Sequence, residues 1–559
     1  MNKKYKALLA AALVSPMLLT TSCIDEVEPT NGVIQEQLES NAKATEAIVW
    51  GMSSHLNQCP TITEDQAYDW GYGSIMHSRD VMGEDLVVSY SGYDWFQSWS
   101  TAGRSLNEEY MICQFSWLFF SEQVLMANNA IKAIAADVTD TDLMALRGAA
   151  LGFRAATYLD MARSYEFLPN NYQSSVNRYN HDVTGYTVPI VTEKTTEEQS
   201  RNNPRVTHDV MVKFIIGDLE EAVNLFTKSK KTVPAKTLPS LGVIYGLLAR
   251  TYLWDASYTE ENLPYQSGIS AMEAYQKAAD YAQLAIAKSG ATPLTRDEWL
   301  STTNGFNDLS VSSWMWGMQY SNEDRAVTSG LLNWTSWMSN ETSFGYASAG
   351  PFLQISAALY DQISDRDFRK LSYVAPEGSP LSGQEKYVSA DLAEKLEFGP
   401  YYSLKFRPGS GNIDDNLIAC SVGVPLMRVE EMYLIKAEAI AHINPTEGAT
   451  ILSDFMQKYR NSSYRFTGAT TDDVVAEVIL QKRVELWGEG QIFFDYKRLN
   501  LDITRSYRGT NFDNAAALYN TTGRPAWMNY VIVRSEGNNN KAVTEWNNPP
   551  CGSVMTPVK

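Results

Sequence analysis

Helical periodicity is clearest between residues 425 and 498, where two long segments enclose a shorter one. In the first segment, apolar side chains recur at steps of three and four, which places them on one face of a helix: Leu426, Val429, Tyr433, Ala437 and Ile440. The last segment begins at Thr470, a suitable N-cap with Asp473 three residues later, and ends at Gly488 to Gly490. The pattern predicts a helical hairpin that packs on a larger body.

Charged residues on a second face of the first helix raise the question of catalysis. Glu431 and Glu438 lie two turns apart, about 10 Å by the helical rise, which is at or beyond the spacing of an inverting glycoside hydrolase. Arg428 shares their face, and this favours an internal ion-pair network over a catalytic pair. The chain contains neither a G-x-S-x-G motif nor a complete phosphate-binding glycine loop. The sequence therefore predicts a protein that is not an enzyme.

Further helical segments precede this hairpin. A pair spans about 115–165, a second pair comprises 205–226 and 241–256, and another helix covers 271–290. Gly148, Gly152 and several alanines leave room for large side chains of a neighbouring helix, as in tetratricopeptide-like packing. Long insertions interrupt the repeat spacing. The predicted fold is mainly α, with tetratricopeptide-like helical repeats in a single globule, long loop-rich insertions and a few short strands.

The first 22 residues have the features of a secretory leader. Lys3, Lys4 and Lys6 precede an apolar run from 7 to 19, and small residues lead to Cys23. This arrangement resembles a bacterial lipobox, in which Cys23 becomes the acylated (palmitate-bearing) first residue. The acidic segment that follows resembles an export tag for the cell surface. We therefore expect a lipoprotein signal peptide at 1–22 and an acidic anchor linker at 23–33.

Two motifs in the 425–498 hairpin carry a family resemblance. The segments MRVEEMYLIKAEA and LQKRVELWGEGQIFFDYKR are similar to the C-terminal signature of the SusD/RagB family of nutrient-binding outer-membrane lipoproteins. The segment 166–210 also resembles this family. The resemblance implies a SusD-like domain over 34–559, with helices at about 115–290 and 425–498 and ligand-binding insertions at about 70–105 and 299–410. It also implies a SusC-like TonB-dependent transporter as partner.

Composition excludes several other classes of function. The net charge is −19, a field that repels phosphate backbones, so nucleic acid is not an expected partner. The five histidines lie far apart without an H-E-x-x-H motif, and no C-x-x-C occurs, so neither a metal site nor a cofactor is predicted. The sequence leaves open bound calcium and the pairing of four cysteines: Cys59, Cys113, Cys420 and Cys551.

Aromatic residues concentrate in the insertions. Polar loop residues surround Trp95 and Trp99, and also Trp334 and Trp337, whereas the alternation of Trp314 and Trp316 indicates a buried strand. Because a pyranose ring stacks its C–H face on an indole and needs planar polar partners, we expect a glycan site there. The predicted ligand-binding residues are Trp95, Trp99, Trp334, Trp337, Arg79, Asp94 and Asn333.

These features together predict a cell-surface lipoprotein, held in the outer membrane by a lipid, that captures an oligosaccharide or polysaccharide and delivers it to the transporter. Two alternatives remain open at this point. One is a RagB-like lipoprotein that captures oligopeptides, and the other is a surface glycoside hydrolase. The sequence does not identify the sugar, its linkage or the stoichiometry with the transporter.

Overall fold

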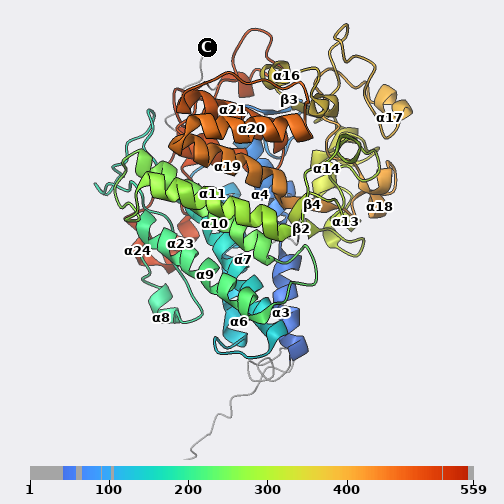
Figure 1. Cartoon of the computed structure of the whole chain (residues 1–559). Helices are drawn as coiled ribbons and strands as arrows, with labels where there is room; N and C mark the ends of the chain where they lie inside the picture. Colours follow the sequence, from blue (N-terminus) through green and yellow to red (C-terminus); the bar gives the residue numbers. More distant parts are fainter. Residues whose placement is uncertain (1–41, 58–65, 90, 102–105, 519, 552–559) are drawn as a thin grey trace, which may run out of the picture.

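The computed structural model describes residues 42–57, 66–89, 91–101, 106–518 and 520–551 (Figure 1). The predicted leader at 1–22, the lipidation site Cys23, the linker at 23–33 and Cys59 lie outside these ranges. Among the described residues, no helix combines the length and the hydrophobicity that a membrane span requires.

Long helices that pack side by side form the main body. From α9 to α21 they lie one above another in Figure 1, with α7 packed against α9, α10 against α11, and α11 against α19. This stacking confirms the predicted mainly helical, tetratricopeptide-like architecture. The long helices are α3 (Ala42–His55), α6 (Met111–Ala133), α7 (Thr141–Tyr165), α9 (His208–Ser229), α10 (Leu241–Glu260), α11 (Ala271–Ser289), α19 (Val429–Ile443), α20 (Pro445–Tyr459) and α21 (Thr471–Glu485).

Small residues let these helices approach closely, as the sequence predicts. A Cβ atom at Gly152 of α7 would lie 2.6 Å from Cδ1 of Ile244 on α10, and one at Gly148 would lie 2.9 Å from the Phe226 ring on α9. Since contacts this short do not occur between real carbon atoms, a larger residue at either position would force the neighbouring side chain to move. The helices interlock through large side chains that fill the gaps left by small ones.

The C-terminal hairpin differs from its prediction in two details. Residues 423–428 form a strand, so Leu426 belongs to β4 and the helix begins at Val429. The middle helix α20 has 15 residues, as many as α19 and α21. The predicted cap is confirmed, because the Thr470 hydroxyl accepts from the Asp473 amide while the Asp473 carboxylate accepts from the amide of Thr470.

The insertions contain short elements, and those of the second insertion lie mainly to one side of the stack (Figure 1). Antiparallel strands close two small sheets, β1 (Leu86–Val88) with β3 (Leu353–Ile355) and β2 (Trp314–Gln319) with β4 (Gly423–Arg428). Trp314 and Trp316 are buried in β2, as expected. The shorter helices are α4 (Gly71–Val81), α5 (Gln97–Ser100), α8 (Glu197–Ser200), α12 (Arg296–Trp299), α13 (Arg325–Thr328), α14 (Trp334–Met338), α15 (Gly345–Ala349), α16 (Ala357–Gln362), α17 (Ala390–Lys395), α18 (Asn416–Ala419), α22 (Ile492–Arg498), α23 (Arg534–Asn539) and α24 (Lys541–Thr544).

Single 3-10 turns complete the insertions and the C-terminal segment: η1 (Ala67–Asp69), η2 (Phe368–Ser372), η3 (Gly409–Gly411), η4 (Ala516–Leu518) and η5 (Ala526–Met528). Part of the first predicted insertion is therefore not a loop. Residues 71–81 form the mostly buried helix α4, and the irregular chain begins only after β1.

A buried cluster of ion pairs joins the hairpin to the insertions. The carboxylate of Glu485 accepts hydrogen bonds from three guanidinium groups: Arg428 at 3.0 Å, Arg460 at 2.8 Å and Arg369 at 2.9 Å. These arginines hold the pKa of Glu485 far below its usual value, against the effect of burial. The cluster contains Arg369, Lys405, Arg428, Arg460, Asp367, Glu430, Glu485 and Glu489.

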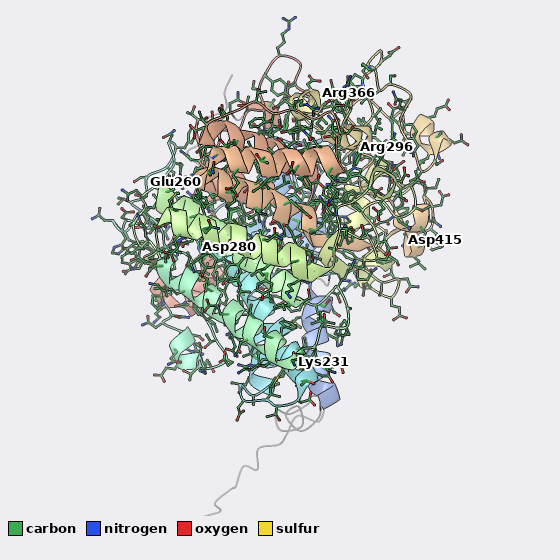
Figure 2. All side chains as sticks on the ribbon, viewed as in Figure 1. Lys231, Glu260, Asp280, Arg296, Arg366 and Asp415 are labelled. Carbon is green, nitrogen blue, oxygen red and sulfur yellow. The ribbon has the colours of Figure 1, made fainter. Side chains whose placement is uncertain are left out.

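Many other charged side chains point to solvent. Lys231, Asp280, Arg366 and Asp415, which are labelled in Figure 2, are exposed. The members of the Glu485 cluster are withdrawn from water, so each charge depends on its partners.

We expect the substitution Glu485→Gln to lower the free energy of unfolding by about 3–5 kcal/mol, since it leaves buried guanidinium groups without their shared carboxylate. Denaturant unfolding followed by circular dichroism measures the change. The matched control is Glu394→Gln on the exposed face of α17, for which we expect a change below about 0.5 kcal/mol. Equal midpoints for the two variants would contradict a structural role for the cluster.

Candidate functional site

The two predicted insertions meet at the irregular segment 91–101. The Phe96 ring packs against Trp337 with centroids 5.8 Å apart, and Tyr93 packs against Tyr346 at the same distance. The pairing of β1 with β3 sets this arrangement, because it lays the chain that enters 91–101 beside the chain that leaves α15. Two aromatic clusters that are far apart in the sequence therefore pack against each other.

The tryptophans of the second insertion lie beneath this surface. Trp334 and Trp337 are each 1% exposed, and Trp99 of the first insertion is 7% exposed. Trp334 packs on Phe406 and lies against Gly73 of α4, while Trp99 packs on Phe96. The prediction that these three rings are exposed is wrong, because they lie in the interior.

The polar residues around Trp334 explain why that prediction was wrong. Asn333 caps α14 by accepting from the Ser336 amide at 3.0 Å, and its own amide donates to the carbonyl of Ala326. Asn340 donates to the carbonyls of Leu353 and Ser403. These side chains satisfy buried backbone groups, so a polar composition that is typical of a surface loop serves the interior here. Asn333 is not a ligand partner in this arrangement.

Arg79 is also a core residue. It is fully buried in α4, donates to the Asp160 carboxylate at 3.1 Å, and places its guanidinium 4.5 Å from the centroid of the Phe494 ring. These contacts tie α4 to α7 and α22. The prediction that Arg79 reaches a ligand is wrong for this reason.

Trp95 and Asp94 do reach the surface. Tyr93, Asp94 and Trp95 are half-buried, with the rings of Tyr93 and Trp95 6.2 Å apart and nearly perpendicular. The Trp95 amide donates to the Tyr346 hydroxyl at 3.3 Å, and the Asp94 carboxylate accepts from the Phe96 amide at 2.9 Å. The segment is therefore held in place while two rings and one carboxylate border solvent.

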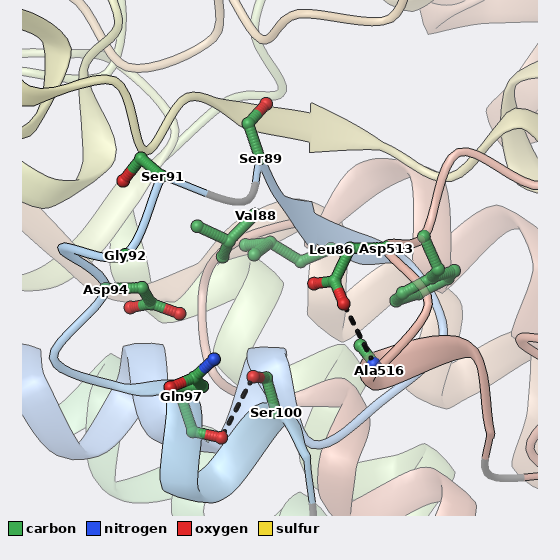
Figure 3. A pocket seen from close by; sticks show the side chains of 11 residues that line it. Leu86, Val88, Ser89, Ser91, Gly92, Asp94, Gln97, Ser100, Asp513 and Ala516 are labelled. Carbon is green, nitrogen blue, oxygen red and sulfur yellow. Dashed lines mark hydrogen bonds between the residues drawn. The ribbon is translucent and has the colours of Figure 1, made fainter.

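A polar notch opens beside these residues (Figure 3). The side chains of Asp94, Gln97 and Asp513 point into the same space, which measures ≈ 20 Å³. That volume admits a water molecule or one hydroxyl group but not a sugar ring. The notch is lined by Leu86, Val88, Ser89, Ser91, Gly92, Asp94, Gln97, Ser100, Phe512, Asp513 and Ala516.

The electrostatics of the notch act on Asp94. Burial raises the pKa of Asp94 to about 6, the Phe96 amide opposes this shift, and the negative charge of Asp513 adds to it. Near neutral pH the two carboxylates present acceptors to a hydroxyl donor, whereas below about pH 6 Asp94 becomes a donor itself.

Sequence reasoning missed Asp513 and Gln97. Asp513 caps a C-terminal turn by accepting from the amides of Ala515 and Ala516, and it lies more than 400 positions from Asp94 in the chain. No local pattern links these two residues. Gln97 lies in the predicted insertion, among the polar residues that surround Trp95 and Trp99, and that composition was the available signal.

The two helix carboxylates considered for catalysis are both engaged in the interior. Glu431 accepts from Arg250 at 2.6 Å, and Glu438 accepts from Arg498 at 2.5 Å and from Lys482 at 3.3 Å. The predicted internal ion pairing is confirmed, but Arg428 pairs with Glu430, Glu485 and Glu489 instead. Across the described ranges, no group of three or more His, Cys, Asp and Glu residues is arranged to hold a metal ion.

Comparison with known proteins places most of the chain in one family. A model described as "SusD family" matches residues 301–550, and a model described as "Starch-binding associating with outer membrane" matches residues 35–253. A search of curated proteins found no match.

Solved structures share the fold at low sequence identity. A SusD-like carbohydrate binding protein from Bacteroides vulgatus has a TM-score of 0.68 at 22% identity, covering 92% of this chain and 99% of its own. A SusD superfamily protein from Bacteroides thetaiotaomicron has a TM-score of 0.64 at 18% identity, with coverages of 91% and 99%. A laminarin binding SusD-like protein has a TM-score of 0.59 at 16% identity, with coverages of 91% and 99%. These similarities show that the chain shares the fold of these structures.

We expect the substitution Asp94→Asn to stabilise the protein progressively between about pH 4 and pH 6. The folded state resists ionisation of Asp94, so the wild type loses stability as pH rises from the pKa of the unfolded chain to that of the folded one, whereas asparagine does not titrate. The expected difference at pH 7 is roughly 1–3 kcal/mol.

Denaturant unfolding at pH 4.0, 5.0 and 7.0 measures this difference. The control is Asp414→Asn at an exposed position, which we expect to leave the pH profile of stability unchanged. A difference between wild type and Asp94→Asn that does not depend on pH would contradict the raised pKa.

Proposed function

Because the chain belongs to the SusD family, we propose that it binds an oligosaccharide or polysaccharide at the cell surface and delivers it to a SusC-like TonB-dependent transporter. Members of this family are binding proteins, and we propose that this chain binds its glycan without cleaving it. The structures with the same fold include one named as carbohydrate binding and one named as laminarin binding, which supports a glycan as cargo.

The observation that carries the proposal is the juxtaposition of two half-buried rings with a polar notch. The rings of Tyr93 and Trp95 offer apolar surface on which the C–H face of a pyranose stacks. The notch beside them is wide enough for one hydroxyl group, which the carboxylates of Asp94 and Asp513 orient as acceptors. Stacking would supply affinity, and the hydroxyl contacts would select the stereochemistry of the sugar.

The rigidity of this site also suits a binding role. Hydrogen bonds from the Trp95 amide to Tyr346 and from the Phe96 amide to Asp94 hold the segment in place. The Phe96 ring also packs on the buried rings of Trp99 and Trp337. A ligand therefore meets a surface that is already arranged, so little conformational entropy is lost on binding.

The lipoprotein part of the proposal comes from the leader. We propose that acylation of Cys23 attaches the protein to the outer membrane, and that the acidic linker 23–33 lets it sit above its transporter. The name of the family model that matches residues 35–253, which refers to association with the outer membrane, supports this location. We propose that the stacked helices face the transporter while the insertions face the glycan.

We expect the purified protein to be retarded in affinity gels that contain one of a panel of polysaccharides, including laminarin, soluble starch, xylan and arabinogalactan. Loss of a central aromatic contact typically costs 2 kcal/mol or more, so Trp95→Ala should weaken binding by about 30-fold. Trp50→Ala, a half-buried tryptophan on α3, is the matched control and should retain the wild-type mobility shift.

Other outcomes distinguish the alternatives. Retardation that survives in Trp95→Ala would contradict the site but not glycan binding. A wild type that no polysaccharide retards, but that binds peptide mixtures, would favour oligopeptide capture. Release of reducing ends from a polysaccharide would show an enzyme.

A further inference from the structure

A row of aromatic rings lies on the molecule away from the Tyr93–Trp95 site. Tyr265 packs against Tyr186 with centroids 5.6 Å apart, Tyr186 packs against Trp546 at 4.9 Å, and Trp546 stacks on His181 at 4.1 Å with ring planes 11° apart. We call these four residues the aromatic row. They come from the segment after α10, the irregular chain between α7 and α9, and the segment after α24.

The aromatic row borders solvent, unlike the tryptophans of α14: Tyr265 is exposed, and His181, Tyr186 and Trp546 are half-buried. Tyr265 is 46% exposed, and the adjacent Tyr179 is 40% exposed with the Arg178 guanidinium 5.1 Å from its ring centroid. The side chain of His181 is 32% exposed. Aromatic rings that stay exposed contribute little to the core, so burial does not explain their presence.

The backbone that displays Tyr265 is strained. Tyr265 has a φ of 61°, and Asn262 and Asn180 in the neighbouring turns have φ values of 56° and 63°. A bulky side chain in the left-handed region costs on the order of 1 kcal/mol or more, and such strain concentrates at functional sites. This backbone conformation presents the Tyr265 ring at the surface, where its printed ring contact is with Tyr186.

Hydrogen bonds fix the aromatic row to the body of the protein. Asn177 donates to the carbonyls of Glu545 and Asn547, which joins the chain before His181 to the chain around Trp546. Arg205 donates to the Trp546 carbonyl at 2.6 Å. The rings are consequently arranged before any ligand arrives, which reduces the entropy cost of binding.

Planar polar groups surround the rings. The Arg178 side chain is 60% exposed beside Glu108, and the Glu545 side chain is 67% exposed beside His181. Burial and the neighbouring Tyr265 raise the pKa of Tyr186 to about 12, so its hydroxyl stays protonated at neutral pH. Exposed rings with guanidinium, carboxylate and phenol groups at their edges match the chemistry that recognises sugars.

We infer that the aromatic row is a second carbohydrate-binding surface, which stacks sugar rings of the same polysaccharide chain that the Tyr93–Trp95 site holds. This inference rests on the proposed glycan function. The row lies by α24 and the end of α10, on the opposite side of the molecule in Figure 1 from α14. Two separated contacts on one polymer increase its retention by avidity, and a short oligosaccharide does not gain this increase.

The test uses Tyr265→Ala and Tyr265→Phe in the gel whose polysaccharide retards the wild type most. Tyr265→Ala should weaken retention of the polymer by at least about threefold, whereas Tyr265→Phe keeps the ring and should retain wild-type mobility. Leu125→Ala removes another exposed apolar side chain, from α6, and should have no effect. Thermal unfolding checks that each variant is folded.

Three outcomes would overturn the inference. If Tyr265→Ala migrates like the wild type while Trp95→Ala loses retention, the aromatic row does not bind glycan although the proposed function stands. If no polysaccharide retards the wild type, both the second binding surface and the proposed function are contradicted. If fluorescein-labelled octalysine binds the wild type, is lost in Tyr265→Ala, and polymer retention is unchanged, the row recognises a cationic peptide instead.

Discussion

The shared carboxylate of Glu485 is the interaction on which the architecture depends. It lies at the end of α21 and binds Arg428 from the start of the hairpin, Arg460 from the end of α20, and Arg369 from the insertion. A charge of this kind is stable in the interior only while every partner is present, because its desolvation is costly. The cluster therefore holds the hairpin and the insertion in one relative position.

The same hairpin also positions the Tyr93–Trp95 segment, where we propose that the glycan binds. Arg483 binds the Asp85 carboxylate at 3.0 Å, and the Trp487 indole donates to the Asp85 carbonyl at 2.9 Å, immediately before β1. The amide of Gly490 donates to Asp80 at the end of α4. Since β1 leads directly into the segment with Tyr93 and Trp95, the hairpin positions this segment through the backbone. These hairpin residues hold the frame, and Tyr93 and Trp95 lie at its surface.

Aromatic residues in this chain lie either in the core or at the surface, and amino-acid composition does not distinguish the two. The polar surroundings of Trp334 and Trp337 suggest a surface loop, yet Asn333 and Asn340 direct their amides to buried carbonyls and the rings are sealed. The exposed ring of Tyr265 and the half-buried ring of Tyr186 lie in segments with no tryptophan of their own. Their partner Trp546 comes from the far end of the chain, so only the folded protein shows them as a row.

The amino-acid sequence alone determined the helices, the Thr470 cap, the close helix packing at Gly148 and Gly152, the internal role of the hairpin charges and the family. These follow from local periodicity, side-chain size and short motifs, which act within a few turns of the chain. The tertiary structure alone decided which partner each charge takes and which aromatic residues reach solvent. Exposure and pairing depend on what packs against a residue from distant segments, as Asp513 does for Asp94, and no local pattern encodes that neighbour.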